Sequence, residues 1–276
     1  MSDARADIVE PRLLTIAGSD SGGAAGLQAD LKTFTALGVY GMSVTTVLTA
    51  QNTLGVQAVE RLPAAFVAAQ LDAVSSDIGV DGLKTGLLGT LELVDLVASK
   101  LAAINCPKVI DPVLVNSSGA LIVETEVIDA YKRRLFGQAM LVTPNLREAQ
   151  ILSGTEIRSS GDIPRAAKAL LASGPHAVLI KGGYLTSNRS LDCLALQNGE
   201  VHWLEATPVE TPNTHGTGCT LAAACATYLA KGETVLTAAQ KAKAFVAGAI
   251  VAGAKRQVGQ GRGPVKHTWQ VEGLEI

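Results

Sequence analysis

One short stretch of the chain combines residue types that could bind a phosphate group. Residues 213–220 read NTHGTGCT and lead directly into an alanine-rich segment. The first turn of a helix leaves backbone N–H groups unpaired and carries a partial positive charge, and a glycine-rich backbone can approach an anion closely. The stretch therefore predicts an anion site at a helix start, with Cys219 beside it. An ordinary glycine-rich turn before a small buried cysteine is the alternative.

Three further polar segments could carry chemistry. Residues 17–30 read AGSDSGGAAGLQAD, residues 49–53 read TAQNT, and residues 143–149 read TPNLREA. The first is not a dinucleotide fingerprint, because its glycines do not follow GxGxxG and no acidic residue ends a well-formed second strand. We interpret the second and third segments as loops that follow strands.

The elements that must position these segments alternate between strands and helices. Short apolar runs are typical of buried parallel strands, and helical periodicity follows most of them. The runs are 13–17, 44–50, 82–88, 108–115, 140–143 and 177–180. Ligands of such sheets bind beyond the carboxyl ends of the strands, where the polar segments fall. The sequence thus predicts an α/β fold with its site at that edge.

Turn residues indicate where several elements end. One helix is expected over 27–37 with Gly38 as its stop, and a second is expected to be capped by Asp162 and ended by Gly174. Asn198-Gly199, between the runs 191–196 and 201–204, predicts a hairpin with a type I′ turn. The parallel core should therefore become antiparallel near one edge.

Composition limits the class of protein. The chain has 276 residues, of which 47% are hydrophobic and 17% charged, and its formal net charge is −2. We expect a single domain over 1–276, with 1–11 as a flexible N-terminal extension. The sequence has no basic run that would form a surface for nucleic acid or an anionic membrane. The longest apolar helical stretch, 245–254, is too short to cross a bilayer. A cytoplasmic protein with a small-molecule partner is expected.

The cysteines and histidines indicate no structural metal. The four cysteines include no CxxC pair, and the four histidines have no ligand-like spacing, so neither a zinc site nor a disulfide framework is expected.

Eight motifs together resemble, in order and at matching intervals, the hydroxymethylpyrimidine/phosphomethylpyrimidine kinases of thiamine biosynthesis. The resemblance covers roughly Leu13 to Trp269, and the motifs read AGSDSGGAAGLQAD, AQNT, LKTGLLG, DPVLV, TPNLREA, LIKGG, NTHGTGCT and GPVKH. The resemblance implies a ribokinase-like three-layer α/β/α sandwich with a central, mostly parallel sheet, and a homodimer. It also implies that ATP, with Mg²⁺, phosphorylates the hydroxymethyl oxygen of 4-amino-5-hydroxymethyl-2-methylpyrimidine and then the resulting monophosphate.

The resemblance assigns catalytic roles around the glycine-rich stretch. Gly216, Thr217 and Gly218 would form an anion hole, Cys219 would deprotonate the acceptor hydroxyl, and Lys181 would reach the nucleotide phosphates. A helix N-terminus favours a thiolate, so we expect a lowered pKa at Cys219. Alternatively, Cys219 only packs against the substrate while the anion hole and the metal carry the chemistry.

Metal-binding roles follow from the same resemblance. Asn145 and Glu148 form the NxxE arrangement that helps to hold magnesium in related kinases, and Asp111 is a weaker candidate. Helix capping by Asn145, with Glu148 at the third helical position, would explain both residues equally well. Asp111 could simply be a turn aspartate.

For the pyrimidine, the resemblance indicates polar and apolar contacts. The amide of Gln51 can donate and accept together, as an aminopyrimidine edge requires, and Asp30 can accept from an amino group. Alternatives are a solvated loop amide for Gln51 and an exposed helix face for Asp30. The pocket wall would comprise Gly18, Ala25, Leu87 and Val113.

Three positions depart from the family pattern. Ala24 stands where a further glycine is usual, Leu87 replaces a common methionine, and Ser117 replaces a loop lysine near the phosphates. The last change bears on the rate or on the second phosphorylation. A pyridoxal or pyridoxine kinase of the same superfamily is the nearest alternative, although 51–53 (QNT) favour the pyrimidine. A non-catalytic pyrimidine-binding sensor is the alternative from another class.

Overall fold

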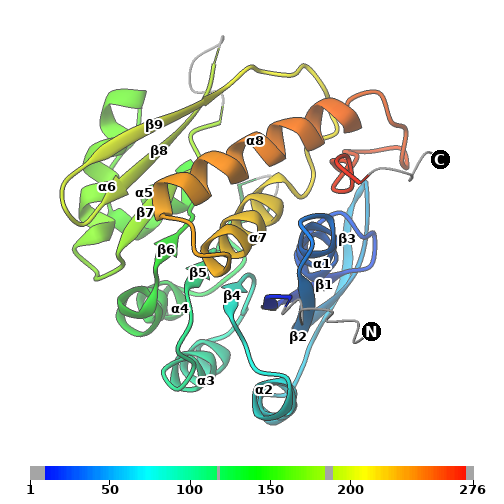
Figure 1. The fold of residues 1–276 in the computed structure, drawn as a ribbon, viewed down its shortest axis with the longest axis vertical. Coiled ribbons are helices and arrows are strands. Elements are labelled where there is room, and N and C mark those ends of the chain that lie inside the picture. The colour runs from blue at the N-terminus through cyan, green and yellow to red at the C-terminus, as the bar shows by residue number, and fades with distance from the viewer. Residues whose placement is uncertain (1–9, 117–118, 184–188, 272–276) are drawn as a thin grey trace, which may run out of the picture.

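Nine strands form one sheet that carries the other elements (Figure 1). The computed structural model describes residues 10–116, 119–183 and 189–271. Ser117 and most of the expected N-terminal extension lie outside these ranges. The strands are β1 (Arg12–Asp20), β2 (Tyr40–Asn52), β3 (Gly55–Arg61), β4 (Gly82–Thr85), β5 (Lys108–Ile110), β6 (Leu141–Val142), β7 (Ala177–Ile180), β8 (Ser190–Leu196) and β9 (Val201–Ala206).

The sheet has a parallel centre and antiparallel edges. Its strand order is β3-β2-β1-β4-β5-β6-β7-β8-β9, and the pairs from β2 to β7 are parallel. The pairs β7-β8 and β8-β9 are antiparallel, as the hairpin pattern predicts. The pair β2-β3 is antiparallel too, an edge that the sequence did not predict. The expected mostly parallel α/β sheet is otherwise confirmed.

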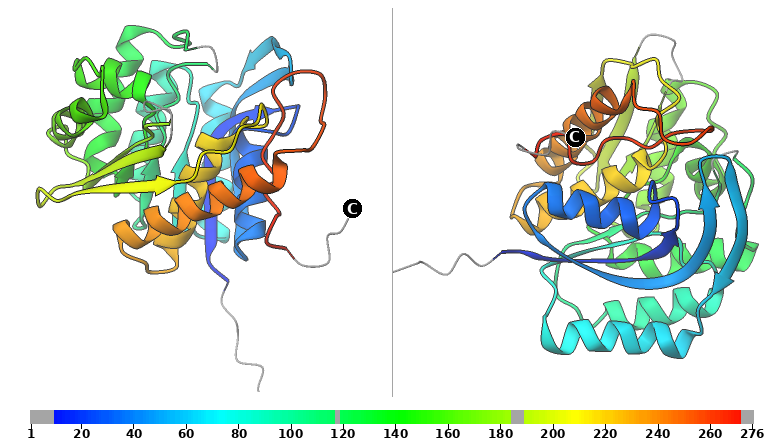
Figure 2. Two further views of the ribbon diagram at one scale, coloured as in Figure 1. Left: turned by 90° about the horizontal axis from the view of Figure 1, so that it is seen from above. Right: turned by 90° about the vertical axis from the view of Figure 1, so that its right-hand side faces the viewer.

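Helices cover both faces of the sheet (Figures 1 and 2). The α-helices are α1 (Gly26–Ala36), α2 (Ala64–Asp77), α3 (Leu91–Leu101), α4 (Thr125–Ala130), α5 (Leu146–Ser153), α6 (Ile163–Leu171), α7 (Thr217–Ala230) and α8 (Val235–Gly253). Shorter turns are the π-helical η1 (Tyr131–Leu135) and the 3₁₀ segments η2 (Phe136–Gln138) and η3 (Ser160–Asp162).

Alternation along the strands divides the buried apolar residues into two clusters. Leu14, Ile110 and Val142 pack with α2 to α6, whereas the preceding residue on each strand packs with α1, α7 and α8. Successive strand side chains point to opposite faces, so each strand contributes to both cores. This is why the central runs read as continuously apolar.

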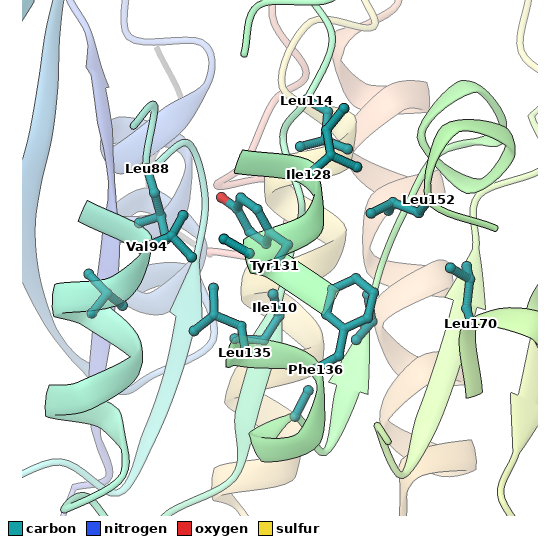
Figure 3. Packing of buried hydrophobic residues seen from close by; sticks show 14 of the residues in the cluster. Leu88, Val94, Ile110, Leu114, Ile128, Tyr131, Leu135, Phe136, Leu152 and Leu170 are labelled. Carbon is teal, nitrogen blue, oxygen red and sulfur yellow. The ribbon is translucent and has the colours of Figure 1, made fainter. Parts of the chain in front are cut away.

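One core contact reaches the carboxyl edge of the sheet. Tyr131 is buried among Leu88, Val94 and Leu135 (Figure 3). Its hydroxyl donates to the carbonyl of Gly86 at 3.2 Å. A buried phenol requires a hydrogen-bond partner, and here the partner is the backbone. The bond thereby fixes the LKTGLLG motif directly after β4.

Three local expectations need correction. The segment 49–53 is not a loop, because β2 continues through Asn52 into the hairpin with β3. Within the described residues only glycines have positive φ, so Asn198 cannot form the expected type I′ turn, and Gly199 alone adopts the left-handed conformation. Asp162 is the N-cap residue of α6 but its side chain makes no capping hydrogen bond there, since its carboxylate accepts from the Ser159 amide at the start of η3.

Helix α8 is longer than the apolar run 245–254 suggested. It has 19 residues and is long and apolar enough to cross a membrane by length and composition alone, which is weak evidence because core helices share these properties. Here it packs against α7 and β9 and contributes Phe245 to a core cluster.

Candidate functional site

A cavity of about 530 Å³ lies at the carboxyl ends of the parallel strands. All the site residues expected from the sequence line it except Asp30. They come from the carboxyl ends of β1 and β2, from segments that follow β1, β4, β5, β6 and β7, and from the start of α7. The cavity therefore occupies the place where an open parallel sheet binds its ligands.

Helix α7 begins at the cavity with an uncapped first turn. Gly216 is its N-cap residue with φ +87°, and no side chain caps the helix. A Cβ at Gly216 would collide with the carbonyl of Ala24, so only glycine fits between the two segments. The free N–H groups of Gly218 and Cys219 are left for an anion.

Lys181 adds a positive charge beside this helix start. Its ammonium group lies close to Gly218, 3.3 Å from the position that a Cβ atom would occupy on that glycine. It forms a 2.8 Å ion pair with Asp111. Asp111 also accepts from the Thr143 hydroxyl at 3.0 Å. Burial disfavours the charged amine, but the carboxylates of Asp111 and Glu148 outweigh it and raise the pKa of Lys181.

Hydrogen bonds on both sides hold the backbone of Lys181. The Lys181 amide donates to the Pro144 carbonyl at 2.9 Å, and the Gly182 amide donates to Asp192 at 3.0 Å. Asp192 is itself paired with Lys243 of α8 at 2.7 Å. The KGG motif is thus fixed between the end of β6 and the start of β8.

Asn145 and Glu148 form the helix cap that the sequence offered as an alternative to metal binding. Asn145 accepts from the Glu148 amide and Glu148 from the Asn145 amide, each at 2.9 Å. The second oxygen of Glu148 accepts from the Leu114 amide at 3.2 Å. Burial raises the pKa of Glu148 to about 7, with Lys181 opposing the rise and Asp111 adding to it.

Asp30 does not lie where the sequence placed it. Its carboxylate is fully buried behind the cavity wall, where Lys84 donates to it at 2.8 Å and the Thr15 hydroxyl at 2.6 Å. The alternative of an exposed helix face is wrong, and Asp30 is not among the residues that line the cavity. Lys84, which does line the cavity, was missed because a lysine inside an apolar run gives no sequence signal of its own.

The expected lowering of the Cys219 pKa is wrong. Burial raises the pKa of this thiol, and the nearby charge of Lys84 only partly opposes the rise. Desolvation penalises the thiolate more than the nearby cation stabilises it in the ligand-free protein. Cys219 is therefore a thiol at neutral pH in this state.

Gln51 lies on strand β2 with both ends of its amide engaged. Its Oε1 lies 3.2 Å from the Thr49 hydroxyl, which is also 2.9 Å from the Ser19 carbonyl, and its Nε2 lies 3.1 Å from His215 Nε2. His215 Nε2 is also 3.6 Å from Asp20. The alternative of a solvated loop amide for Gln51 is wrong.

Asp20 is a second residue that sequence reasoning missed. It accepts from the backbone amides of Gly22, Ala24 and Ala25 at 2.8 to 3.0 Å and so fixes the loop after β1. Burial opposes its charge, but the hydrogen bonds from these three amides help to lower the pKa of Asp20. The aspartate before two glycines is the sequence signal for such a turn.

Comparisons with known proteins agree with this geometry. Residues 20–266 match the family described as phosphomethylpyrimidine kinase. A hydroxymethylpyrimidine/phosphomethylpyrimidine kinase from Streptomyces coelicolor is 48% identical over 262 residues, which are 95% of this chain and 96% of that protein.

Solved structures show the same fold. The ADP complex of Bacillus subtilis pyridoxal kinase has a TM-score of 0.87 at 38% identity and covers 95% of this chain and 98% of its own. A phosphomethylpyrimidine kinase from Clostridium difficile has a TM-score of 0.77 at 37% identity, covering 87% and 100%. These likenesses confirm the ribokinase-like fold expected from the sequence.

Proposed function

Because this chain belongs to the phosphomethylpyrimidine kinase family, we propose that it transfers the γ-phosphoryl group of ATP to hydroxymethylpyrimidine and then to its monophosphate. The observation that carries the proposal is one cavity that joins an uncapped helix start and a lysine at one end to the amide of Gln51. The former suits phosphates, and the latter suits an aminopyrimidine edge.

The residues at the start of α7 act on the phosphoryl group. Phosphoryl transfer requires mainly positioning and neutralisation of charge on the transferred oxygens. Gly216, Thr217 and Gly218 supply the open helix start, and Lys181 supplies a mobile cation that exchanges its partner Asp111 for a phosphate oxygen. Fixed donors of this kind are worth about 3–4 kcal/mol in the barrier.

Cys219 accepts the proton of the hydroxymethyl group in this proposal. Its thiol lies at the same helix start, within the field of Lys84, whose ammonium group is fixed by Asp30. Burial raises the Cys219 pKa, so forming the thiolate, which is the base, costs desolvation free energy. The positive charge of Lys84 offsets part of that cost.

The residues present fit magnesium. Among the described residues no group of three His, Cys, Asp or Glu side chains could hold a metal, so an ion here would need phosphate oxygens or water as further ligands. Glu148, Asp111 and Asn145 offer the hard oxygen donors that Mg²⁺ prefers. A cation would also favour the charged form of Glu148, whose pKa burial raises. The metal would neutralise phosphate charge when bound.

We also infer a cytoplasmic homodimer. ATP as co-substrate fits the cytoplasm. Strand β3 is an edge of the sheet and all its residues are exposed, as an edge covered by a second copy would be. Light scattering after size exclusion tests this state, since a monomer at micromolar concentration would contradict it.

Pyridoxal phosphorylation is the second candidate, because the Bacillus subtilis structure with a TM-score of 0.87 is a pyridoxal kinase. The test gives the protein Mg-ATP with hydroxymethylpyrimidine, its monophosphate or pyridoxal and separates the products by chromatography. Diphosphate from both pyrimidines supports the proposal. Product from pyridoxal alone would replace it, and tight pyrimidine binding without product would favour a sensor.

A further inference from the structure

We propose that His215 is a positioning residue that holds the Gln51 amide in one orientation and thereby makes the site selective for an aminopyrimidine over pyridoxal. The inference rests on the proposed function and adds to it a determinant of substrate choice. It is carried by the hydrogen bonds around Gln51.

The partner that can fix the direction of the Gln51 amide is His215. Oε1 lies 3.2 Å from the Thr49 hydroxyl, whose single proton has a nearer acceptor in the Ser19 carbonyl at 2.9 Å, while Nε2 donates to His215 Nε2 at 3.1 Å. The amide nitrogen keeps a second N–H and the amide oxygen keeps a second lone pair. Because Gln51 lines the cavity, both are available to a ligand. The amide thus presents a donor on the His215 side and an acceptor on the Thr49 side.

An aminopyrimidine matches this pair in one direction only. Its ring nitrogen accepts on the His215 side, its amino group donates on the Thr49 side, and the hydroxymethyl carbon is the next ring substituent beyond the amino group. If the amide turned over, the pyrimidine edge would reverse and move the hydroxyl away from its place. Pyridoxal has no amino group beside a ring nitrogen, so it cannot hydrogen-bond to the donor and the acceptor of the Gln51 amide together.

His215 can hold the amide only as an acceptor. Its Nε2 must be unprotonated, with the ring proton on Nδ1. Asp20 lies 3.6 Å from the same nitrogen, which is beyond hydrogen-bond distance, and its oxygens are engaged by three backbone amides. A proton on Nε2 would turn His215 toward Asp20 and leave Gln51 Nε2 without its acceptor.

The backbone of His215 is fixed by the GPVKH motif, whose purpose the proposed chemistry does not explain. The His215 amide donates to the Gly263 carbonyl at 3.0 Å, and the Val265 amide donates to the His215 carbonyl at 3.3 Å. Asn213 fixes the same loop by donating to carbonyls at the end of α8, including that of Gly253 at 2.9 Å. The loop that carries His215 is therefore fixed by the end of α8 and by the GPVKH motif that follows it.

The test compares His215→Leu, which removes the acceptor, with His215→Gln, whose side-chain oxygen restores an acceptor near the position of Nε2. Steady-state constants are measured for hydroxymethylpyrimidine and for pyridoxal, with His202→Leu on β9 as the control. We expect His215→Leu to lower kcat/KM for the pyrimidine at least about tenfold, through kcat more than KM, and to leave the pyridoxal value within about twofold. His215→Gln should recover most of the loss.

Equal losses for both substrates, or no loss for either, would overturn the proposal. Nitrogen-15 NMR of the imidazoles gives an independent readout, with the His215 signals assigned from the variants. An unprotonated Nε2 that shifts in Gln51→Leu supports the contact, whereas a protonated Nε2 in the wild type overturns it. If the wild type phosphorylates neither compound, the proposed function fails and the NMR result alone decides the contact.

Discussion

The ammonium group of Lys84 lies 2.8 Å from the Asp30 carboxylate, and neither side chain is exposed to solvent. Lys84 faces the cavity and Asp30 lies behind it. One oxygen of Asp30, Oδ1, is buried without a hydrogen-bond partner. The pair therefore maintains a positive charge next to Cys219 at a cost in desolvation.

Breaking this ion pair should strongly destabilise the protein. Asp30→Asn and Lys84→Met each leave one buried charge without its partner, so each should lower the free energy of unfolding by about 3–5 kcal/mol. The double variant Asp30→Leu/Lys84→Met should lose less than the sum of the single variants. Urea denaturation followed by circular dichroism measures all three, and strictly additive losses would contradict the pairing.

Lys181→Met should lower kcat by about a hundredfold or more, because it removes the cation beside the uncapped start of α7. The matched control is Lys100→Met, which removes a lysine from the exposed pair with Asp72. A coupled assay of ADP formation measures kcat for both variants. Similar activities in both would exclude a phosphate role for Lys181.

Cys219→Ala should reduce turnover far more than it weakens pyrimidine binding. Because burial raises the pKa of Cys219, the base form increases with pH, and wild-type kcat should rise as the pH increases above neutrality. In Cys219→Ala this rise should disappear, whereas Cys106→Ala should keep it. Activity of Cys219→Ala within a few-fold of the parent would remove the base assignment.

Glu148 should make the protein less stable as the pH rises from 4.5 to 7. Burial raises its pKa from 4.5 to about 7, so the folded state binds its proton more tightly than the unfolded state. The free energy of unfolding then falls with increasing pH across this window, by no more than about 3 kcal/mol. Glu148→Gln should flatten that dependence in thermal melts.

The same variant tests the metal role. If Glu148 helps to hold magnesium, Glu148→Gln should need a higher Mg²⁺ concentration for half-maximal activity than the wild type does. Glu156→Gln, which alters an exposed carboxylate of the pair with Arg158, is the control. An unchanged magnesium dependence would leave Glu148 with its capping role alone.

Gln51→Leu should raise the KM for the pyrimidine about tenfold or more, since it removes both polar contacts to the aminopyrimidine edge. Gln57→Leu on the exposed strand β3 is the matched control. An unchanged KM in Gln51→Leu would place the pyrimidine elsewhere in the cavity.

The sequence predicts the centre of this fold well and its edges less well. Apolar runs identified the parallel strands because those strands are buried on both faces. Strand β3 was missed since all its residues are exposed and no apolar face marks it. The extension of β2 through Gln51 depends on pairing with β3, which polar residues do not signal.

Within the site, motif order identified most of the residues that line the cavity but not the ion pair between Lys84 and Asp30. Asp30 and Lys84 are far apart in the sequence, and only the packing of α1 against β1, with β4 beside β1 in the sheet, brings them together. Likewise, the helix start indicated a lowered pKa for Cys219, while the desolvation that reverses its direction depends on tertiary burial.

Gln51 and His215 are 164 residues apart in the sequence, and Gly261 bonds to Thr53 across 208 residues. The cavity wall thus joins the first quarter of the chain to its last described segment. Closing such long loops is slow and costs chain entropy, so these contacts form only when distant parts of the chain have docked. A ligand that contacts both ends of the cavity consequently binds only the fully folded chain. Its binding free energy therefore stabilises the whole protein against unfolding.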